Sequence, residues 1–124
     1  SYIHAGNKIA TIVGLSTNFD QAREVAKNIC MQVAAMNPVA LNEDGVSKQI
    51  IEKEIEIAKE QLRSEGKPEA MLDNIAKGKL KKYFKDNTLI NQAFIKDNKK
   101  SVNDYIKSVN SDCYITNFKR VSLV

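Results

Sequence analysis

Residues 46–85, VSKQIIEKEIEIAKEQLRSEGKPEAMLDNIAKGKLKKYFK, decide the fold of this 124-residue chain. In their first half, apolar side chains recur at offsets of three and four, the spacing of one helical stripe: Ile51, Ile55, Ala58 and Leu62. The second half continues in the same way with Leu72, Ile75, Ala76, Leu80, Tyr83 and Phe84. Gly66 suits the left-handed residue that ends a helix, and Pro68 suits the first turn of the next one. The pattern predicts two antiparallel helices that turn at residues 66–68.

The two predicted helices differ in charge. Residues 47–63 hold four acids and four bases, whereas residues 67–85 hold six lysines and two acids, which gives the second helix a charge of +4. The whole chain also carries +4, and four lysines of the second helix lie close together: Lys77, Lys79, Lys81 and Lys82. Such a basic face suits an acidic partner or nucleic acid, although a solvated helix face is the ordinary alternative.

The flanking segments predict a small sheet with helices packed on it. Residues 2–4 and 9–15 have the composition of strands, with a turn at Gly6 and Asn7 between them, and residues 114–124 suit a third strand. Apolar residues of the 9–15 strand fall on both faces, so we expect it to be covered on both sides or central in its sheet. We therefore predict one α+β domain over residues 1–124. It should contain a three-stranded antiparallel sheet and an antiparallel helical hairpin inserted at about 46–85.

Two further helices are predicted from their ends. Asn18 and Gln21 have the spacing of a capping box, so a helix should begin there and end before the proline that follows Asn37. Ser101 should cap a short helix near the end of the chain. Residues 86–100 between the hairpin and this helix are expected to be polar and irregular.

A search for catalytic or ligand-binding chemistry finds little. His4 is the single histidine, and Cys30 and Cys113 stand apart without zinc or CxxC spacing. The sequence has no glycine-rich phosphate loop, and Glu52 and Glu54 would point to different sides of a helix. It shows neither a signal peptide nor an apolar run of membrane length. We therefore predict a protein that is not an enzyme, has no cofactor or metal, and is located in a reducing cytoplasm.

What remains is surface. Phe94 and Ile95 form an apolar pair in a polar segment, where they either line the core or anchor a partner. His4 is likewise open to a structural or a contact role. Gly78, inside the second hairpin helix, costs about 1 kcal/mol against alanine, which we interpret as a sign of close approach by another helix. The chain stops within an apolar strand, so we expect it to be a piece of a longer protein.

The order of these pieces resembles the C-terminal half of the bacterial elongation factor Ts family. The resemblance runs through nearly the whole chain: Tyr2-Ile3-His4, residues 25–35 with Pro38, Glu52-Lys53-Glu54, residues 64–68 and 78–84, residues 89–97, and Phe118-Lys119-Arg120-Val121. Its most specific parts are the Gly-Lys-Pro turn at residues 66–68 and the run LINQAFIKD at residues 89–97.

The resemblance implies an α+β subdomain of a dimerisation core, with a coiled-coil hairpin inserted in it. It also implies a non-catalytic guanine-nucleotide exchange factor, which binds elongation factor Tu and loosens its hold on magnesium and GDP so that GTP can enter. By position, His4, Phe94 and Ile95 lie where this subdomain meets the third domain of the GTPase. The hairpin would be a further interaction arm, and its basic contact face would consist of Lys77, Lys79, Lys81 and Lys82.

The chain also departs from the family pattern. Its 124 residues contain no Thr-Asp-Phe motif, whose phenylalanine wedges near the magnesium site in the family. Thr17-Asn18-Phe19 and Thr116-Asn117-Phe118 are similar in type but stand in another context. The family's N-terminal ubiquitin-associated-like domain and C-terminal helical module are missing as well. We expect the chain to hold part of the docking surface without the exchange wedge.

Two other functions stay open. The hairpin could bind RNA through residues 77–85, but no aromatic side chains are interleaved with its lysines for base stacking, so nucleic acid is the weaker choice. Alternatively, the chain could be a self-association unit that forms a homodimer. No membrane association is expected.

Overall fold

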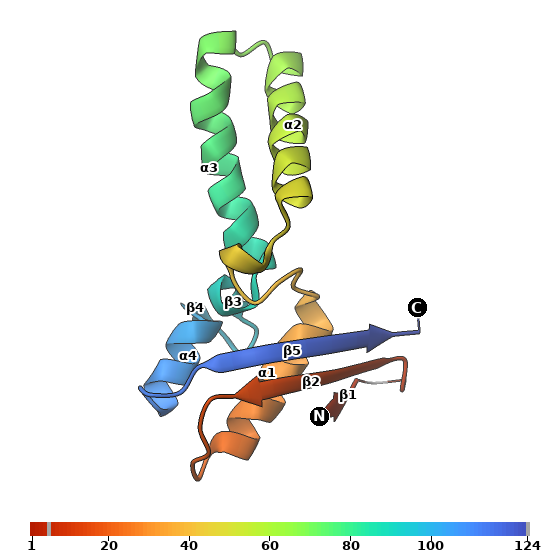
Figure 1. Ribbon diagram of the computed structural model, residues 1–124, viewed down its shortest axis with the longest axis vertical. Coiled ribbons are helices and arrows are strands. Elements are labelled where there is room, and N and C mark those ends of the chain that lie inside the picture. The colour runs from red at the N-terminus through yellow and green to blue at the C-terminus, as the bar shows by residue number, and fades with distance from the viewer. Residues whose placement is uncertain (5, 124) are drawn as a thin grey trace.

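The chain folds into an α+β body from which a helical arm projects (Figure 1), in a computed structural model that describes residues 1–4 and 6–123. The predicted fold class and the inserted helical hairpin are both confirmed. The elements follow in the order β1 (Tyr2–Ile3), β2 (Ile9–Leu15), α1 (Ala22–Met36), η1 (Glu43–Gly45), α2 (Lys48–Ser64), α3 (Glu69–Asn87), η2 (Leu89–Asn91), β3 (Ala93–Phe94), β4 (Asp97–Ser101), α4 (Val102–Val109) and β5 (Ile115–Ser122).

A three-stranded antiparallel sheet forms one layer of the body. Its order is β1-β2-β5, so β2 is central as the sequence predicted. Gly6 and Asn7, with φ of 86° and 57°, stand in the predicted turn between β1 and β2. β5 ends at Ser122, and Val124, the last residue of the predicted strand, lies outside the described residues. Figure 1 shows α1 behind this sheet, on one of its two faces.

The core of the body lies around α1. Its buried apolar side chains come from α1, from α4 and from the segments on either side of α4: Val25, Ile29, Val33, Leu89, Phe94, Val102, Ile106, Cys113 and Ile115. Seven of the 15 residues of α1 are buried, and they include the polar Asn28 and Gln32. Seven buried positions are more than one helical stripe provides, so α1 is enclosed on more than one side.

The predicted capping box at Asn18 is wrong. α1 begins one residue after Gln21, which makes no side-chain capping hydrogen bond. The first amide of the helix donates instead to the Phe19 carbonyl at 2.9 Å, and the partly buried Phe19 packs against the core. Burial of this ring outweighs the local capping preference. The cap at Ser101 is confirmed, because its Oγ accepts a hydrogen bond at 3.1 Å from the amide three residues later.

Residues 86–100 are more regular than the sequence predicted. They complete α3, form the turn η2 and then pair β3 with β4 in a second antiparallel sheet. A single parallel bridge joins Ala40 to Thr88, and the Leu89 amide donates to the Ala40 carbonyl at 2.9 Å. These contacts lie about fifty positions apart in the chain. Such pairings leave no local periodicity in the sequence, which is why the prediction of an irregular segment was wrong.

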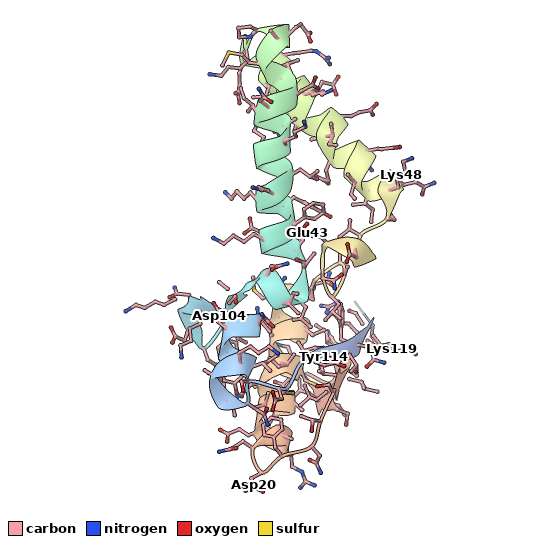
Figure 2. All side chains as sticks on the ribbon, turned by 60° about the vertical axis from the view of Figure 1, so that its left-hand side comes forward. Asp20, Glu43, Lys48, Asp104, Tyr114 and Lys119 are labelled. Carbon is pink, nitrogen blue, oxygen red and sulfur yellow. The ribbon has the colours of Figure 1, made fainter. Side chains whose placement is uncertain are left out.

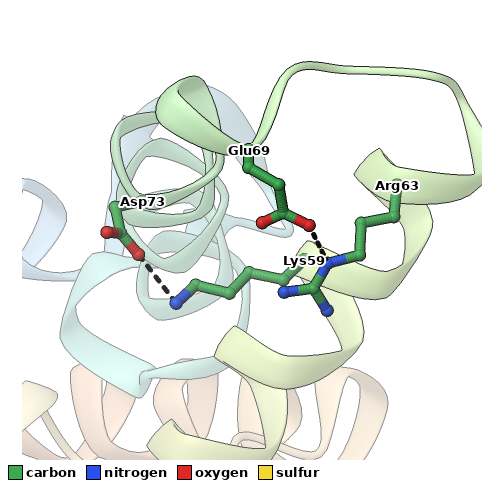
Figure 3. Close-up of polar contacts among 4 residues, drawn as sticks. All are labelled: Lys59, Arg63, Glu69 and Asp73. Carbon is green, nitrogen blue, oxygen red and sulfur yellow. Dashed lines mark hydrogen bonds and ion pairs between the residues drawn. The ribbon is translucent and has the colours of Figure 1, made fainter.

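The arm is held together most tightly near its tip. Ala58 and Leu62 of α2 and Leu72 and Ala76 of α3 are all buried there. On the surface beside them, Lys59 Nζ lies 2.7 Å from Asp73, and Arg63 Nε lies 2.8 Å from Glu69 (Figure 3). Because these ion pairs are solvent-exposed, their contribution is small, and the apolar stripe provides most of the stability of the arm.

Gly78 lies in the middle of α3 in open space. A Cβ atom built on it would meet nothing within 4 Å outside its own helix backbone and chain neighbours. The expectation that another helix approaches it closely is therefore wrong.

We expect Gly78→Ala to raise the free energy of unfolding by about 0.5–1 kcal/mol, because alanine restricts the unfolded chain and fits the helix without a clash. Urea denaturation followed by circular dichroism measures this change. Gly66→Ala is the matched control, since Gly66 has φ of +80° and its substitution should lower stability. A Gly78→Ala variant less stable than the wild type would contradict the assignment of open space.

Candidate partner-binding surface

The apolar pair Phe94-Ile95 is divided by the structure. Phe94 is only 3% exposed and stacks on Tyr105, with ring centroids 4.1 Å apart and planes at 13°. Ile95 is 39% exposed and forms, with Lys96, the two-residue turn between β3 and β4. Phe94 thus supports the turn from the core side, and Ile95 is the member of the pair that a partner can reach. Contact of either residue with a partner stays a prediction.

The turn at Ile95 is held by a buried side chain that the sequence analysis did not single out. The Ile95 amide donates to Gln32 Oε1 at 2.8 Å, and Gln32 Nε2 donates to the Ala93 carbonyl at 3.0 Å. Gln32 lies on α1 and is fully buried. The signal available in the sequence was a glutamine inside the apolar stripe of a helix, next to Ile29 and Val33.

A hollow of about 510 Å³ lies beside this turn. It is bordered by α1, the turn and α4, and Glu24, Asn28, Phe94, Lys96 and Tyr105 are among the residues that line it. The Asn28 side-chain amide donates to the Tyr105 hydroxyl at 2.9 Å, which fixes one wall. An apolar floor with a few polar groups at its rim is suited to receive a partner's side chain.

His4 lies on another part of the body. It follows β1, and its amide donates to the Ile9 carbonyl at 2.8 Å. Its half-buried ring lies 5.9 Å from that of Tyr2, and its Nδ1 lies 3.3 Å from the Tyr2 hydroxyl. Figure 1 shows β1 and the β3–β4 pair on different sides of α1. His4 and Ile95 are therefore two separate contact candidates on different elements, and a partner touching both would have to span α1.

The four lysines of the predicted basic face are all exposed, but they do not form one group. Lys79 and Lys82 line a groove between α2 and α3, whereas Lys77 and Lys81, four residues apart, share a separate stripe of α3. The groove measures about 350 Å³ and also carries acids, Glu54 among them. Only part of the basic cluster can therefore face any one partner surface.

Tyr83 lies on the same groove, half-buried near the base of the arm. Burial raises the pKa of its hydroxyl above the ordinary value, and the nearby Glu54 carboxylate raises it further. The open base of the arm thus combines an aromatic side chain with charges of both signs.

The outer face of the three-stranded sheet is apolar and uncovered. Ile3, Ala10 and Val121 stand in one row across the three strands, and Ile3 and Val121 are each 63% exposed. Ile12 is also exposed, opposite Lys119, which is labelled in Figure 2. The sequence analysis expected β2 to be either central or covered on both sides, and the structure shows it central with one face free. A row of exposed apolar side chains of this kind is typical of an interaction surface.

Within the described residues, no cluster of three or more histidine, cysteine, aspartate or glutamate side chains is arranged to bind a metal ion. Both cysteines are buried and unpaired. None of the helices in the described part of the chain is long and apolar enough to span a bilayer. The features that stand out are the exposed turn, the groove of the arm and the sheet face, all of which suit recognition of another macromolecule.

We expect Glu54→Gln to lower the pKa of Tyr83 while leaving it above the ordinary value, because burial is the larger cause of the shift. An NMR titration of the tyrosine rings measures this pKa. Glu52→Gln serves as the control, since Glu52 is exposed on α2 and does not line the groove. An unchanged pKa of Tyr83 in the Glu54 variant would contradict the electrostatic contribution.

Comparison with known proteins adds a family to this geometry. The family model described as elongation factor TS matches residues 1–123. A protein of Christiangramia forsetii named elongation factor Ts is 64% identical over 123 residues, which cover 99% of this chain and 45% of the relative. The elongation factor Ts of Flavobacterium psychrophilum is 59% identical with the same coverage. That of Amoebophilus asiaticus is 50% identical over 97% of this chain and 44% of its own length. The chain therefore spans slightly less than half the length of these relatives.

Proposed function

The chain belongs to the elongation factor Ts family, and from this premise we propose that it carries part of the surface by which such a factor binds the GTPase elongation factor Tu in the cytoplasm. The observation that carries the proposal is Ile95, an exposed apolar side chain on a turn that is fixed by hydrogen bonds from the core. A partly exposed aliphatic residue on a rigid support is typical of an interface anchor, because little entropy is lost when it is buried.

The mechanism that we propose for the complete factor is a coupling of two binding equilibria. A factor that binds the nucleotide-free GTPase more tightly than the GDP-bound form must weaken GDP binding by the same ratio. Each tenfold preference corresponds to about 1.4 kcal/mol. In this mechanism the residues of the present chain contribute docking energy, and no covalent step is assigned to them.

Docking is proposed to involve the body and the arm together. Ile95 would make the central apolar contact, with the adjacent hollow receiving a side chain of the GTPase. His4 is proposed as a second contact at the sheet edge, and the groove lysines Lys79 and Lys82 as contacts of the arm. Phe94 is proposed to act from beneath, through its stack on Tyr105. We do not extend the proposal to RNA, because Tyr83, the aromatic residue next to these lysines, is half-buried in the groove.

We expect the wild-type chain to bind elongation factor Tu in a calorimetric titration and Ile95→Asp to weaken binding at least tenfold, or about 1.4 kcal/mol. A carboxylate at this place would have to be desolvated in an apolar contact. Val39→Asp is the matched control, since Val39 has a similar exposure on the connector between α1 and η1.

Absence of binding by the wild-type chain at high micromolar concentration would count against the proposed docking role. The same samples separate docking from exchange when release of fluorescent GDP is followed. We expect little acceleration of release, because the 124 residues lack the Thr-Asp-Phe motif that the family resemblance associates with the magnesium site.

A second candidate function is self-association through the outer face of the sheet. Its support is the exposed row of Ile3, Ala10 and Val121, whose burial against a second copy would remove apolar surface from water. The two-fold arrangement of such a dimer would place the same face of both copies in contact.

We expect sedimentation velocity over a micromolar to millimolar series to show a dimer for the wild type and a monomer for Val121→Lys. Ile57→Lys, which changes an isoleucine on the arm, should leave the association unchanged. A wild-type chain that stays monomeric at millimolar concentration would refute this second function.

A further inference from the structure

A continuous path of hydrogen bonds joins the base of the arm to the turn that carries Ile95. Gln92 Nε2 donates to the Asp86 carbonyl in the last turn of α3 at 3.1 Å. Gln32 Nε2 donates to Gln92 Oε1 at 3.2 Å, and Gln32 Oε1 accepts from the Ile95 amide at 2.8 Å. Three segments that are far apart in the sequence thus meet at two side chains.

Both glutamines are almost completely removed from solvent, with Gln32 0% and Gln92 1% exposed. Burial of an amide side chain is costly unless its polar atoms are hydrogen-bonded. Gln32 meets this condition, because its Nε2 donates two hydrogen bonds and its Oε1 accepts one. These partners leave one orientation for the amide group, since turning it over would set Oε1 against two acceptors and Nε2 against a donor.

The other hydrogen bonds at the base of the arm do not reach the turn. The Val39 amide donates to the Asn87 carbonyl at 2.8 Å, and the Leu89 amide to the Ala40 carbonyl at 2.9 Å. These bonds join α3 to the connector after α1. Of the contacts described here, those of Gln32 and Gln92 are the ones that fix the Ile95 backbone relative to α3.

From this geometry we infer that Gln32 and Gln92 are positioning residues, which hold the turn of Ile95 and the α2–α3 arm in one fixed relative orientation for a shared partner. The inference rests on the proposed function, in which both the turn and the arm contact the GTPase. Satisfied buried networks are rigid, and a surface that is already ordered loses less entropy on binding. Neither glutamine touches the partner in this account, and both act through the elements that they hold.

The first test needs no partner. Gln32→Leu keeps the side-chain size but removes the acceptor of the Ile95 amide. Hydrogen exchange measured by NMR should show that this amide exchanges at least tenfold faster in the variant, relative to the amide of Ile29 in α1. Thr11→Val is the matched control, because it removes one buried hydrogen bond to the opposite side of α1, from Thr11 Oγ1 to the Cys30 carbonyl. It should leave exchange at Ile95 unchanged.

The second test uses the GTPase itself. Gln32→Leu should weaken binding at least fivefold, and in its background Ile95→Ala should cost much less affinity than in the wild type. The double variant Gln32→Leu/Gln92→Leu should regain part of the lost thermal stability, since both members of the pair become apolar together, but not the lost affinity. Thr11→Val should bind as tightly as the wild type.

The outcomes separate the two claims. A wild-type chain that does not bind the GTPase refutes the proposed function, whereas unchanged exchange at Ile95 in Gln32→Leu refutes the positioning role whatever the partner does. Full affinity of Gln32→Leu, or an undiminished cost of Ile95→Ala in that background, also overturns the inference. Faster exchange at Ile95 together with weaker binding and a reduced cost of Ile95→Ala supports it.

Discussion

The enclosure of α1 is the constraint on which the rest of the structure depends. On one side, Thr11 of the sheet bonds to the Cys30 carbonyl, and on another, Asn28 and Gln32 bond to Tyr105 and to the β3–β4 turn. A helix surrounded in this way has no free face on which to slide or rotate, because its apolar and polar contacts each select one register. The sheet, the turn and the base of the arm are therefore positioned relative to the same rod. This explains how a small body can present separate contact elements in a defined geometry.

Local pattern was enough to predict the elements whose shape is decided within a few residues. The hairpin helices, the strand of residues 9–15 and the cap at Ser101 follow from periodicity, alternation and one hydroxyl, and the structure contains all three. Prediction failed where a distant contact decides. Burial of Phe19 overrides the capping box at Asn18, and the bridge from Ala40 to Thr88 orders a segment with no periodicity of its own. Gly78 misled because an isolated glycine has no single structural meaning without its neighbours.

The candidate site was predicted in the same uneven way. Ile95 was named from the resemblance, but its separation from Phe94 depends on the alternation of a two-residue strand, which the sequence did not predict. The lysines were correctly placed on one helix, yet only the helical phase relative to α2 tells which of them share a groove. Gln32 was missed because a polar residue inside an apolar stripe reads as an exception to the pattern. Its partners, Gln92 and the Ile95 amide, are 60 or more residues away.

The bridge between Ala40 and Thr88 has a consequence for how such a protein can evolve. The two ends of the inserted arm leave and rejoin the body at adjacent points, and the hydrogen bonds there do not involve the helices further out. Whole helical turns can then be gained or lost in pairs from α2 and α3 without disturbing the packing around α1. The body and the arm are in this sense separate units of inheritance: the reach of the arm is free to vary between lineages, while its point of attachment is not.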